Sequence, residues 1–143
     1  MINIPLLKKI CETPSAPGFQ QRMRELVIEE VRPLVDDLMV DNIGNVMAIK
    51  KGKARQRVMV AAHMDEIGFI VTHIDEEGFV RFHTLGGFDP KTLTSQRVII
   101  HGKKDVIGVM GSKPIHLMKP EERTKQVPIN EYFIDLGMPK EQV

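Results

Sequence analysis

One stretch of the sequence combines residue types at a spacing that could do chemistry. It is AAHMDEIG at residues 61–68, in which His63 and Asp65 are two positions apart. In an extended chain two such side chains point to the same face. A neutral imidazole is a good ligand for zinc or cobalt, and a nearby carboxylate can accept the other ring N–H and fix the tautomer of the ring. The pattern therefore predicts a metal ligand with an orienting partner; the alternative is an ordinary polar pair at the end of a strand.

The other groups that could complete a hydrolytic metal site are weaker candidates, because such a site needs three or four protein ligands and a general base. His116 lies in an expected loop. The carboxylates at 75–77 precede Gly78 and fit a solvent-facing turn. Cys11 is the only cysteine, has no nearby partner and is expected to be buried. Three further histidines fall on expected hairpins, where surface or cross-strand roles are usual: His73, His83 and His101.

Two helices and a hairpin are expected ahead of this cluster. The first helix covers residues 5–11, and the second runs from about 19 to 32, where apolar residues recur at helical spacing. Pro33 ends the second helix, because the residue before a proline is pushed out of the helical region. Residues 38–40 and 45–49 then have the character of strands around the turn sequence DNIG, which predicts a hairpin.

A buried strand is expected to carry the cluster. Residues 58–62, VMVAA, are continuously apolar, which is typical of a strand covered on both faces in the parallel sheet of an α/β protein. His63 follows at its carboxyl end, where open α/β sheets place their ligand crevice. The basic run at 50–55, shortly before the strand, is expected to be a solvated loop.

After Gly68 the pattern changes to short strands joined by glycine-containing turns, with no long helix between them. This favours a small β-barrel or sandwich, so we place a boundary near Gly68 between an α/β portion and a β portion. Strands are expected at residues 69–74, 79–85, 97–101, 106–110 and 132–135.

The final residues, 136–143, resemble the first turn of a helix with Pro139 near its start. A single helical turn gains little stability, because nucleation of a helix is unfavourable. Two explanations stay open, a frayed tail and a sequence that has been cut.

The composition narrows the class of protein. The 143 residues are 42% hydrophobic and 27% charged, as in soluble globular proteins of one domain or two small lobes. The 20 basic and 19 acidic side chains give a net charge of +1, whereas nucleic-acid-binding modules carry a clear basic excess. No long uncharged apolar run could span a membrane. A lone cysteine suits a reducing compartment, so we expect a cytoplasmic protein with neither a nucleic-acid partner nor a membrane partner.

Several motifs, in the same order along the chain, resemble those of a known metallopeptidase family. They are DNIGN at 41–45, VAAHMDEIGF at 60–69, LGGFD at 85–89, QRV at 96–98, GVMGSKP at 108–114 and FID at 133–135. The family is that of the glutamyl and tetrahedral aminopeptidases, whose members are often labelled endoglucanase or cellulase M. The resemblance covers essentially the whole chain.

The resemblance implies a fold and an activity. The fold class is α/β, with residues 1–68 as the N-terminal part of a layered α/β catalytic domain and residues 69–143 as an incomplete PDZ-like β-barrel insert for dimerisation and assembly. Members bind two divalent metal ions, commonly zinc or cobalt, and remove N-terminal residues from peptides by metal-assisted hydrolysis. His63 matches the metal-ligand histidine of the motif, and Asp65 matches the aspartate that orients this ligand and serves as the catalytic residue here.

The chain also departs from the family pattern. The bridging aspartate, the adjacent glutamates that supply the general base, a further aspartate and the last histidine lie beyond the β domain in the family and have no counterpart here. We therefore expect a truncated member that is inactive as an isolated chain, with a peptide substrate for the full-length family and homo-oligomerisation. The alternative is a non-enzymatic oligomerisation or peptide-binding module derived from that family.

Overall fold

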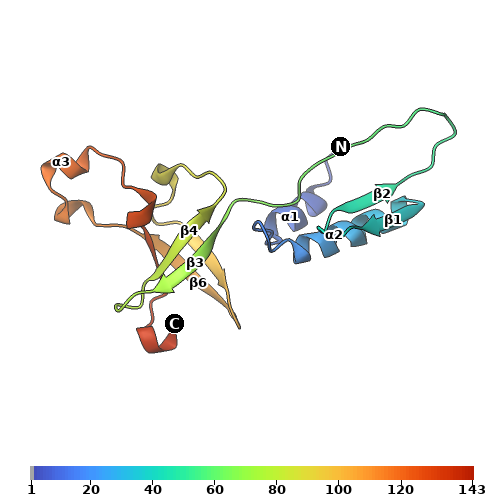
Figure 1. The fold of residues 1–143 in the computed structure, drawn as a ribbon. Helices are drawn as coiled ribbons and strands as arrows, with labels where there is room; N and C mark the ends of the chain where they lie inside the picture. The colour runs from blue at the N-terminus through green and yellow to red at the C-terminus, as the bar shows by residue number, and fades with distance from the viewer. Residues whose placement is uncertain (1) are drawn as a thin grey trace. The chain divides into compact units, whose positions relative to one another are not determined.

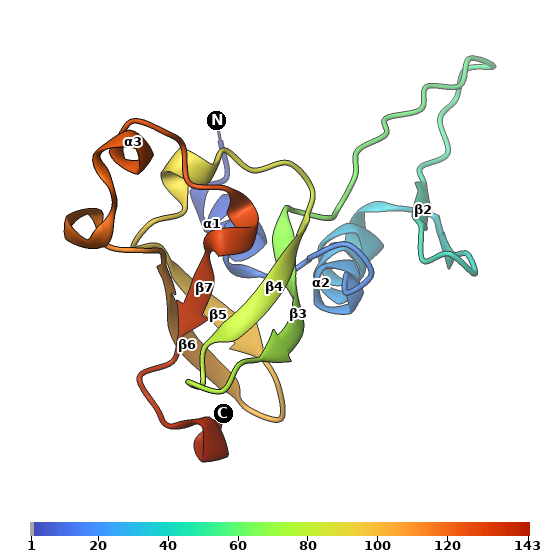
Figure 2. The same ribbon diagram turned by 60° about the vertical axis from the view of Figure 1, so that its left-hand side comes forward.

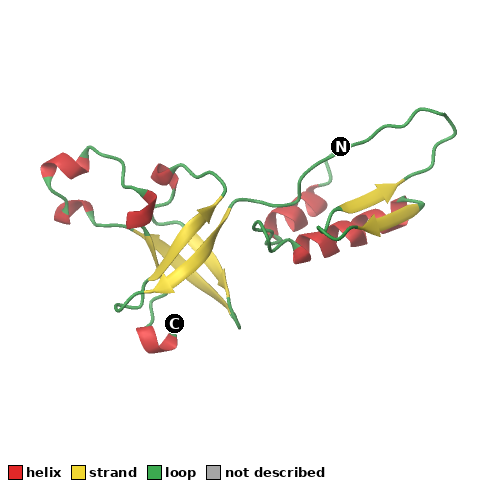
Figure 3. Cartoon of the chain, in the orientation of Figure 1, coloured by secondary structure: helices red, strands yellow, loops and turns green. Residues whose placement is uncertain are grey.

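The computed structural model describes residues 2–143, and in it the chain divides into two compact units. The first unit ends at Glu66 and the second comprises Ile67–Val143, so the division lies within two residues of the boundary expected near Gly68. Both units mix helix and strand (Figures 1 and 3). Among the helices formed by residues 2–143, none has the length and apolar character that crossing a membrane would require.

Two helices open the first unit. Helix α1, Ile4–Glu12, begins after Asn3, whose side chain accepts a hydrogen bond from the N–H of Leu6 at 3.1 Å and so caps the helix. Helix α2, Gln21–Val31, continues into a 3₁₀ turn, η1, at Arg32–Leu34. Both helices lie where the apolar spacing predicted them, and the α-helical geometry ends just before the Arg32–Pro33 pair, as the proline predicted.

The expected hairpin follows. Strands β1, Asp37–Val40, and β2, Val46–Ile49, pair antiparallel. The carboxylate of Asp41 holds the turn, because its Oδ1 atom accepts the backbone N–H groups of residues 43–45, each at 2.9 Å. Gly44 has a φ of +99°, a backbone conformation that favours glycine, so the DNIG sequence suits the turn it forms.

The buried strand expected at residues 58–62 is not formed. Residues 56–67 have no regular secondary structure, and the side chains of Val58, Met59 and Val60 are 88%, 88% and 91% exposed. A strand obtains its backbone hydrogen bonds from neighbouring strands, and no strand within residues 2–143 lies beside this segment. The prediction of a parallel strand covered on both faces is therefore wrong for this structure.

The second unit is built on one antiparallel sheet of five strands in the order β3-β4-β7-β6-β5. The short strand β7 lies between the β3–β4 and β5–β6 hairpins (Figure 2). Because β3 and β5 are the two edges and are not paired with each other, the described residues form an open sheet where the pattern predicted a small β-barrel or sandwich. The strands are β3 Gly68–Ile74, β4 Val80–Leu85, β5 Arg97–His101, β6 Asp105–Gly111 and β7 Phe133–Asp135.

The connections of the second unit contain short helical turns. The helix start expected at residues 136–143 is only a 3₁₀ turn, because a single turn at the end of the chain has no further helical hydrogen bonds to stabilise it. The turns are η2 Pro90–Thr92, η3 Ile115–Leu117, α3 Pro120–Arg123, η4 Ile129–Glu131 and η5 Lys140–Gln142.

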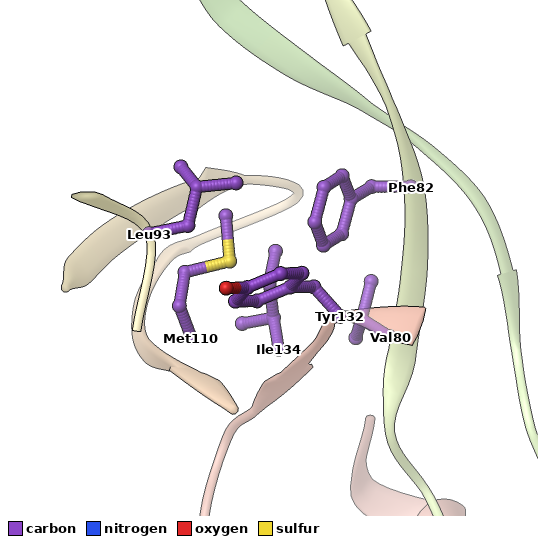
Figure 4. Packing of buried hydrophobic residues seen from close by; sticks show 6 residues of the cluster. All are labelled: Val80, Phe82, Leu93, Met110, Tyr132 and Ile134. Atoms are coloured by element: carbon purple, nitrogen blue, oxygen red, sulfur yellow. The ribbon is translucent and has the colours of Figure 1, made fainter. Parts of the chain in front are cut away.

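The core of the second unit lies against this sheet. Its side chains are 1–7% exposed and come from both hairpins, from β7 and the residue just before it, and from the connection after β4 (Figure 4). Met23 is the one hydrophobic residue buried to the same degree among the described residues of the first unit. The second unit therefore has a core of its own, and the first has almost none. The clustered core residues are Val80, Phe82, Leu93, Met110, Tyr132 and Ile134.

Candidate metal site

The candidate cluster forms a small hydrogen-bonded unit at the end of the irregular segment 56–67. The Nδ1 atom of His63 lies 2.8 Å from the backbone oxygen of Asp65 and 3.1 Å from Oδ1 of the same residue. Both partners can only accept a hydrogen bond when the carboxylate is ionised, so Nδ1 carries the proton. In the neutral ring this leaves the lone pair on Nε2, the atom that an imidazole then presents to a metal.

The backbone beside this unit is fixed to the loop after α1. The N–H of Glu66 donates to the carbonyl oxygen of Ser15 at 3.0 Å, and Ser15 is 2% exposed. The side chain of Asp65 is 38% exposed, while that of His63 is 84% exposed. The orienting carboxylate is thus the more covered partner, and the imidazole extends from it into solvent.

A cavity of about 300 Å³ lies beside the cluster, with His63 and Asp65 among its lining residues. Most of the other lining is apolar and comes from the two helices, including Ile10, Met23 and Val27. Cys11 also lines it and is exposed, so the expectation of a buried cysteine is wrong. The reason is that α1 has no buried residue, because little of the first unit lies over this helix.

The described residues do not form a complete metal site. Within residues 2–143 no group of three or more His, Cys, Asp and Glu side chains is placed to hold a metal ion. The donor chemistry at His63 fits one ligand with its orienting carboxylate, but zinc needs three or four ligands. The described residues thus offer one fixed ligand and do not provide a full coordination set.

The other four histidines belong to the second unit and are exposed. For the three on hairpins the strand pattern predicted a surface or cross-strand position. The Nδ1 atom of His101 lies 3.0 Å from Oδ1 of Asp105 at the end of its hairpin, and that of His73 lies 3.3 Å from the hydroxyl of Thr72. The remaining two, His83 and His116, lie on β4 and in η3.

The acidic turn of the second unit has a structural role that the sequence analysis missed. Glu76 and Glu77 are exposed as expected, but the side chain of Asp75 is only 15% exposed and accepts hydrogen bonds from Arg81 at 2.7 and 2.9 Å. Partial burial raises the pKa of Asp75, but the bonds from Arg81 and from the N–H of Phe79 outweigh it, so the pKa lies below its ordinary value of 3.8. The sequence signal for this ion pair was Arg81, the basic residue six positions after Asp75.

Comparison with known proteins gives consistent results. The family described as M42 glutamyl aminopeptidase matches residues 44–143. Lysyl aminopeptidase of Pyrococcus furiosus is 36% identical over 140 residues, which are 96% of this chain and 40% of that protein. The TET aminopeptidase of a marine sediment Thaumarchaeota archaeon superposes with a TM-score of 0.89 at 38% identity over 97% of this chain and 39% of its own.

A third similar protein is the TET1 peptidase of Pyrococcus horikoshii, with a TM-score of 0.81 at 35% identity over 97% of this chain and 42% of its own. That peptidase can assemble into a tetrahedron or a large octahedral shell. The chain spans about two fifths of the length of each of these three proteins.

Proposed function

The chain belongs to the M42 glutamyl aminopeptidase family, and we propose that it carries the first metal-binding motif of an aminopeptidase that uses two divalent metal ions. In this proposal residues 1–68 are part of an α/β catalytic domain, and residues 69–143 are a PDZ-like β insert. His63 is a metal ligand, and Asp65 is the residue that orients it. Zinc and cobalt, and a cytoplasmic location, stay predictions from the sequence.

The observation that carries the proposal is the contact between Nδ1 of His63 and the two oxygens of Asp65. These acceptors favour the tautomer with its proton on Nδ1, so Nε2 is kept free of a proton and able to bind a cation. A divalent metal, when bound, would supply a Lewis acid for hydrolysis. Asp65 positions the imidazole, and the bond from Glu66 to Ser15 positions the backbone that carries both.

We propose that the complete aminopeptidase removes N-terminal residues from peptides. The 143-residue chain is proposed to lack this activity when it is alone, because the described residues offer a single fixed ligand and no metal-binding group of three. Incubation with an aminoacyl chromogenic substrate and added zinc or cobalt should give no release above that of the metal salt. Turnover that disappears in His63→Ala would overturn the proposed inactivity and retain the proposed role of His63.

A second function is assembly without catalysis, and one observation favours it. Ile99 and Ile107 are cross-strand partners on β5 and β6 and are 56% and 63% exposed, so an apolar pair faces outward at the edge of the sheet. The second unit would then serve as a self-association surface, in keeping with the assemblies of the TET1 peptidase. Light scattering tests this: a monomer with or without metal would count against it.

A further inference from the structure

The connection between β6 and β7 contains a cavity that the proposed catalytic role does not use. The connection covers residues 112–132, and its regular elements η3, α3 and η4 have only three or four residues each. Figures 1 and 2 both show the part around α3 extending away from the strands of the sheet. Connections longer than about 12–15 residues with little regular structure are uncommon in compact domains and usually have a function. The length of this connection therefore favours a binding role.

The size of the cavity limits what it can bind. Its volume is about 190 Å³, and all of its lining residues belong to this connection. Since one water molecule takes about 30 Å³ in the liquid, the volume corresponds to about six water molecules. Pockets for drug-sized ligands are larger, from about 300 Å³ upward. The cavity therefore suits a molecule of the size of a single amino acid and is too small for a peptide.

The walls of the cavity are held in place by contacts within the second unit. The Nζ atom of Lys113 donates to Oε2 of Glu122 at 2.8 Å, and the backbone N–H of Lys119 donates to the same oxygen at 2.9 Å. Val127, another lining residue, packs against the core of the unit. The chain itself thus forms the cavity before any ligand is bound, which lowers the entropic cost of binding.

Charged groups of both signs at the cavity can still bind a ligand. Both hydrogen bonds to Glu122 reach Oε2, so Oε1 can still accept one. Lys125 and Glu131 are exposed, and their side chains form no hydrogen bond or ion pair within residues 2–143. The pKa of Glu122 lies below its ordinary value of 4.5, chiefly because Lys113 donates to it, and the positive charge of Lys125 adds to this effect. An ammonium group and two carboxylates are therefore available at one small cavity.

We propose that this cavity binds a free α-amino acid with an apolar side chain. Lys125 binds the α-carboxylate of the ligand, and Glu131 together with Oε1 of Glu122 accepts hydrogen bonds from its α-ammonium group. Met118 and Val127 belong to the lining and provide an apolar surface for the ligand side chain. The three kinds of group that an apolar amino acid carries thus each have a counterpart.

The balance of charges favours a zwitterion over a simple ion. A dianion such as phosphate would lie beside two carboxylates, and a diamine would lie beside two ammonium groups, so each would meet repulsion as well as attraction. An α-amino acid carries one charge of each sign and is attracted by both kinds of group. The charged lining residues are Lys113, Glu122, Lys125 and Glu131.

Binding of an amino acid here does not depend on a metal role for His63, because the cavity belongs entirely to the second unit. One consequence does rest on the proposed function. An aminopeptidase releases free amino acids, so in a complete enzyme the second unit would bind the product of the reaction.

The test uses the full 143-residue chain and L-leucine, with two analogues that keep the same side chain. Leucinamide lacks the carboxylate, and 4-methylpentanoate lacks the ammonium group. In NMR titrations L-leucine should shift the amides of residues 113–131 with a Kd on the order of 1 mM. Each analogue should bind about threefold or more weakly, and amides of the β1–β2 hairpin should not shift. Absence of saturable shifts, or equal binding of L-leucine and inorganic phosphate, would overturn the proposal.

Two variants assign the charged contacts. Lys125→Gln should weaken binding of L-leucine about threefold or more and leave that of leucinamide unchanged, because leucinamide has no carboxylate to lose. Glu131→Gln should weaken binding of L-leucine and leave that of 4-methylpentanoate unchanged. Retained binding of the analogue shows that the cavity is still formed in each variant. A variant that weakens L-leucine and its analogue equally would contradict the assigned contact.

Matched controls come from the same unit. Lys104→Gln and Glu121→Gln remove charges from residues that are exposed and outside the lining, so both should bind L-leucine normally. If these controls weaken binding as much as Lys125→Gln and Glu131→Gln do, a general change in charge explains the effect and the site is refuted.

A last variant separates this inference from the proposed function. His63→Ala should bind L-leucine as the unaltered chain does, while losing metal bound at position 63. Weaker binding of L-leucine in this variant would place the ligand at the candidate metal site and contradict the inference. Normal metal binding in it would refute the assignment of His63 and leave the amino-acid site intact.

Discussion

The ring of His63 is held by Asp65 through two contacts, one to the backbone oxygen at 2.8 Å and one to the carboxylate at 3.1 Å. The two side chains differ in exposure, 84% for the histidine and 38% for the aspartate. A partly covered carboxylate thus orients an exposed imidazole, so the ring has a defined direction without being packed in a core. Because two acceptors share one N–H, removal of the carboxylate leaves part of the restraint in place.

This geometry predicts a graded loss of metal binding. Asp65→Ala should weaken binding of cobalt at His63 by about tenfold or more, since residues that orient metal ligands are typically worth 10–100-fold in affinity. Asp65→Asn, which keeps an acceptor oxygen but removes the charge, should lose less. Cobalt-induced broadening of the His63 ring signals in NMR titrations measures both. His116→Ala is the control and should not change the titration of His63; an unchanged affinity in Asp65→Ala would contradict the orienting role.

A second prediction concerns the close packing of β6 on β7. A Cβ atom added at Gly108 would clash with the side chain of Ile134. It would also lie 2.8 Å from Cδ2 of Leu136 and 3.3 Å from the carbonyl oxygen of Asp135. Gly108→Ala should therefore destabilise the second unit by about 1–3 kcal/mol, the usual effect of overpacking. Urea unfolding followed by the fluorescence of Tyr132, the single tyrosine in a chain without tryptophan, reports it.

Gly102→Ala is the matched control for this substitution. It lies in the turn of the same hairpin, and the nearest atom to an added Cβ is 3.6 Å away, at ordinary contact distance. Its unfolding midpoint should stay close to that of the unaltered chain. Equal destabilisation by the two alanines would mean that the loss of glycine itself, and not contact with Ile134, is responsible.

The hairpins were predictable because the information for them is local. Residues 41–45 and 75–79 each place an aspartate ahead of a glycine, and in both turns the aspartate accepts backbone N–H groups that follow it. The alternation of apolar and polar residues on either side of each turn then favours strands, and the partner strand is only a few residues away. The same local reasoning anticipated that His63 and Asp65 would be near each other.

The failures of prediction come from contacts between distant residues. Residues 58–62 have the composition of a central strand, but a strand needs neighbours that lie elsewhere in a sequence. Cys11 was expected to be buried, yet it is exposed, because burial depends on what packs over α1. The ion pair of Asp75 with Arg81 is a different case, because it is local: it crosses the β3–β4 turn, and the basic residue six positions on could have indicated it.

A third prediction is a pH dependence of the β1–β2 hairpin. The pKa of Asp41 lies below its ordinary value of 3.8, chiefly because the Asn45 side chain donates to its carboxylate at 2.7 Å and backbone N–H groups add to this. A group whose pKa is lowered by folding stabilises the fold above the unfolded value and ceases to do so as the pH falls through the folded value. The hairpin should therefore keep its stability down to about pH 4 and lose it below 3.8.

Amide chemical shifts of Gly44 and Asn45 followed from pH 6 to pH 2 measure this titration. Asp41→Asn removes the titrating group, so its hairpin should be less stable at pH 7 and should show no added loss from this position at low pH. A titration midpoint of Asp41 above 3.8, or an identical acid transition in Asp41→Asn, would show that the turn does not bind the ionised carboxylate preferentially.

The last prediction concerns the hydroxyl of Tyr132, a core residue. This hydroxyl is hydrogen-bonded to the segment that follows β4. Tyr132 is 4% exposed, and its hydroxyl donates to the carbonyl oxygen of Pro90 at 2.8 Å. The hydroxyl of Thr94, at 3.3 Å, must then act as donor to the tyrosine oxygen. Tyr132→Phe keeps the ring in place and removes both bonds, so it should cost about 0.5–1.5 kcal/mol. The carbonyl oxygen of Pro90 then loses one of its two donors and keeps the N–H of Leu93 at 3.2 Å.

Thr94→Val separates the two bonds, since it removes the donor to Tyr132 and leaves the bond to Pro90. Thr94 is exposed, so water can replace the lost contact and this variant should lose well under half as much stability as Tyr132→Phe. Urea unfolding monitored by circular dichroism allows the comparison, as it does not depend on tyrosine fluorescence. If Tyr132→Phe is as stable as the unaltered chain, the bond to Pro90 does not hold this connection, and packing of the ring alone explains the burial of Tyr132.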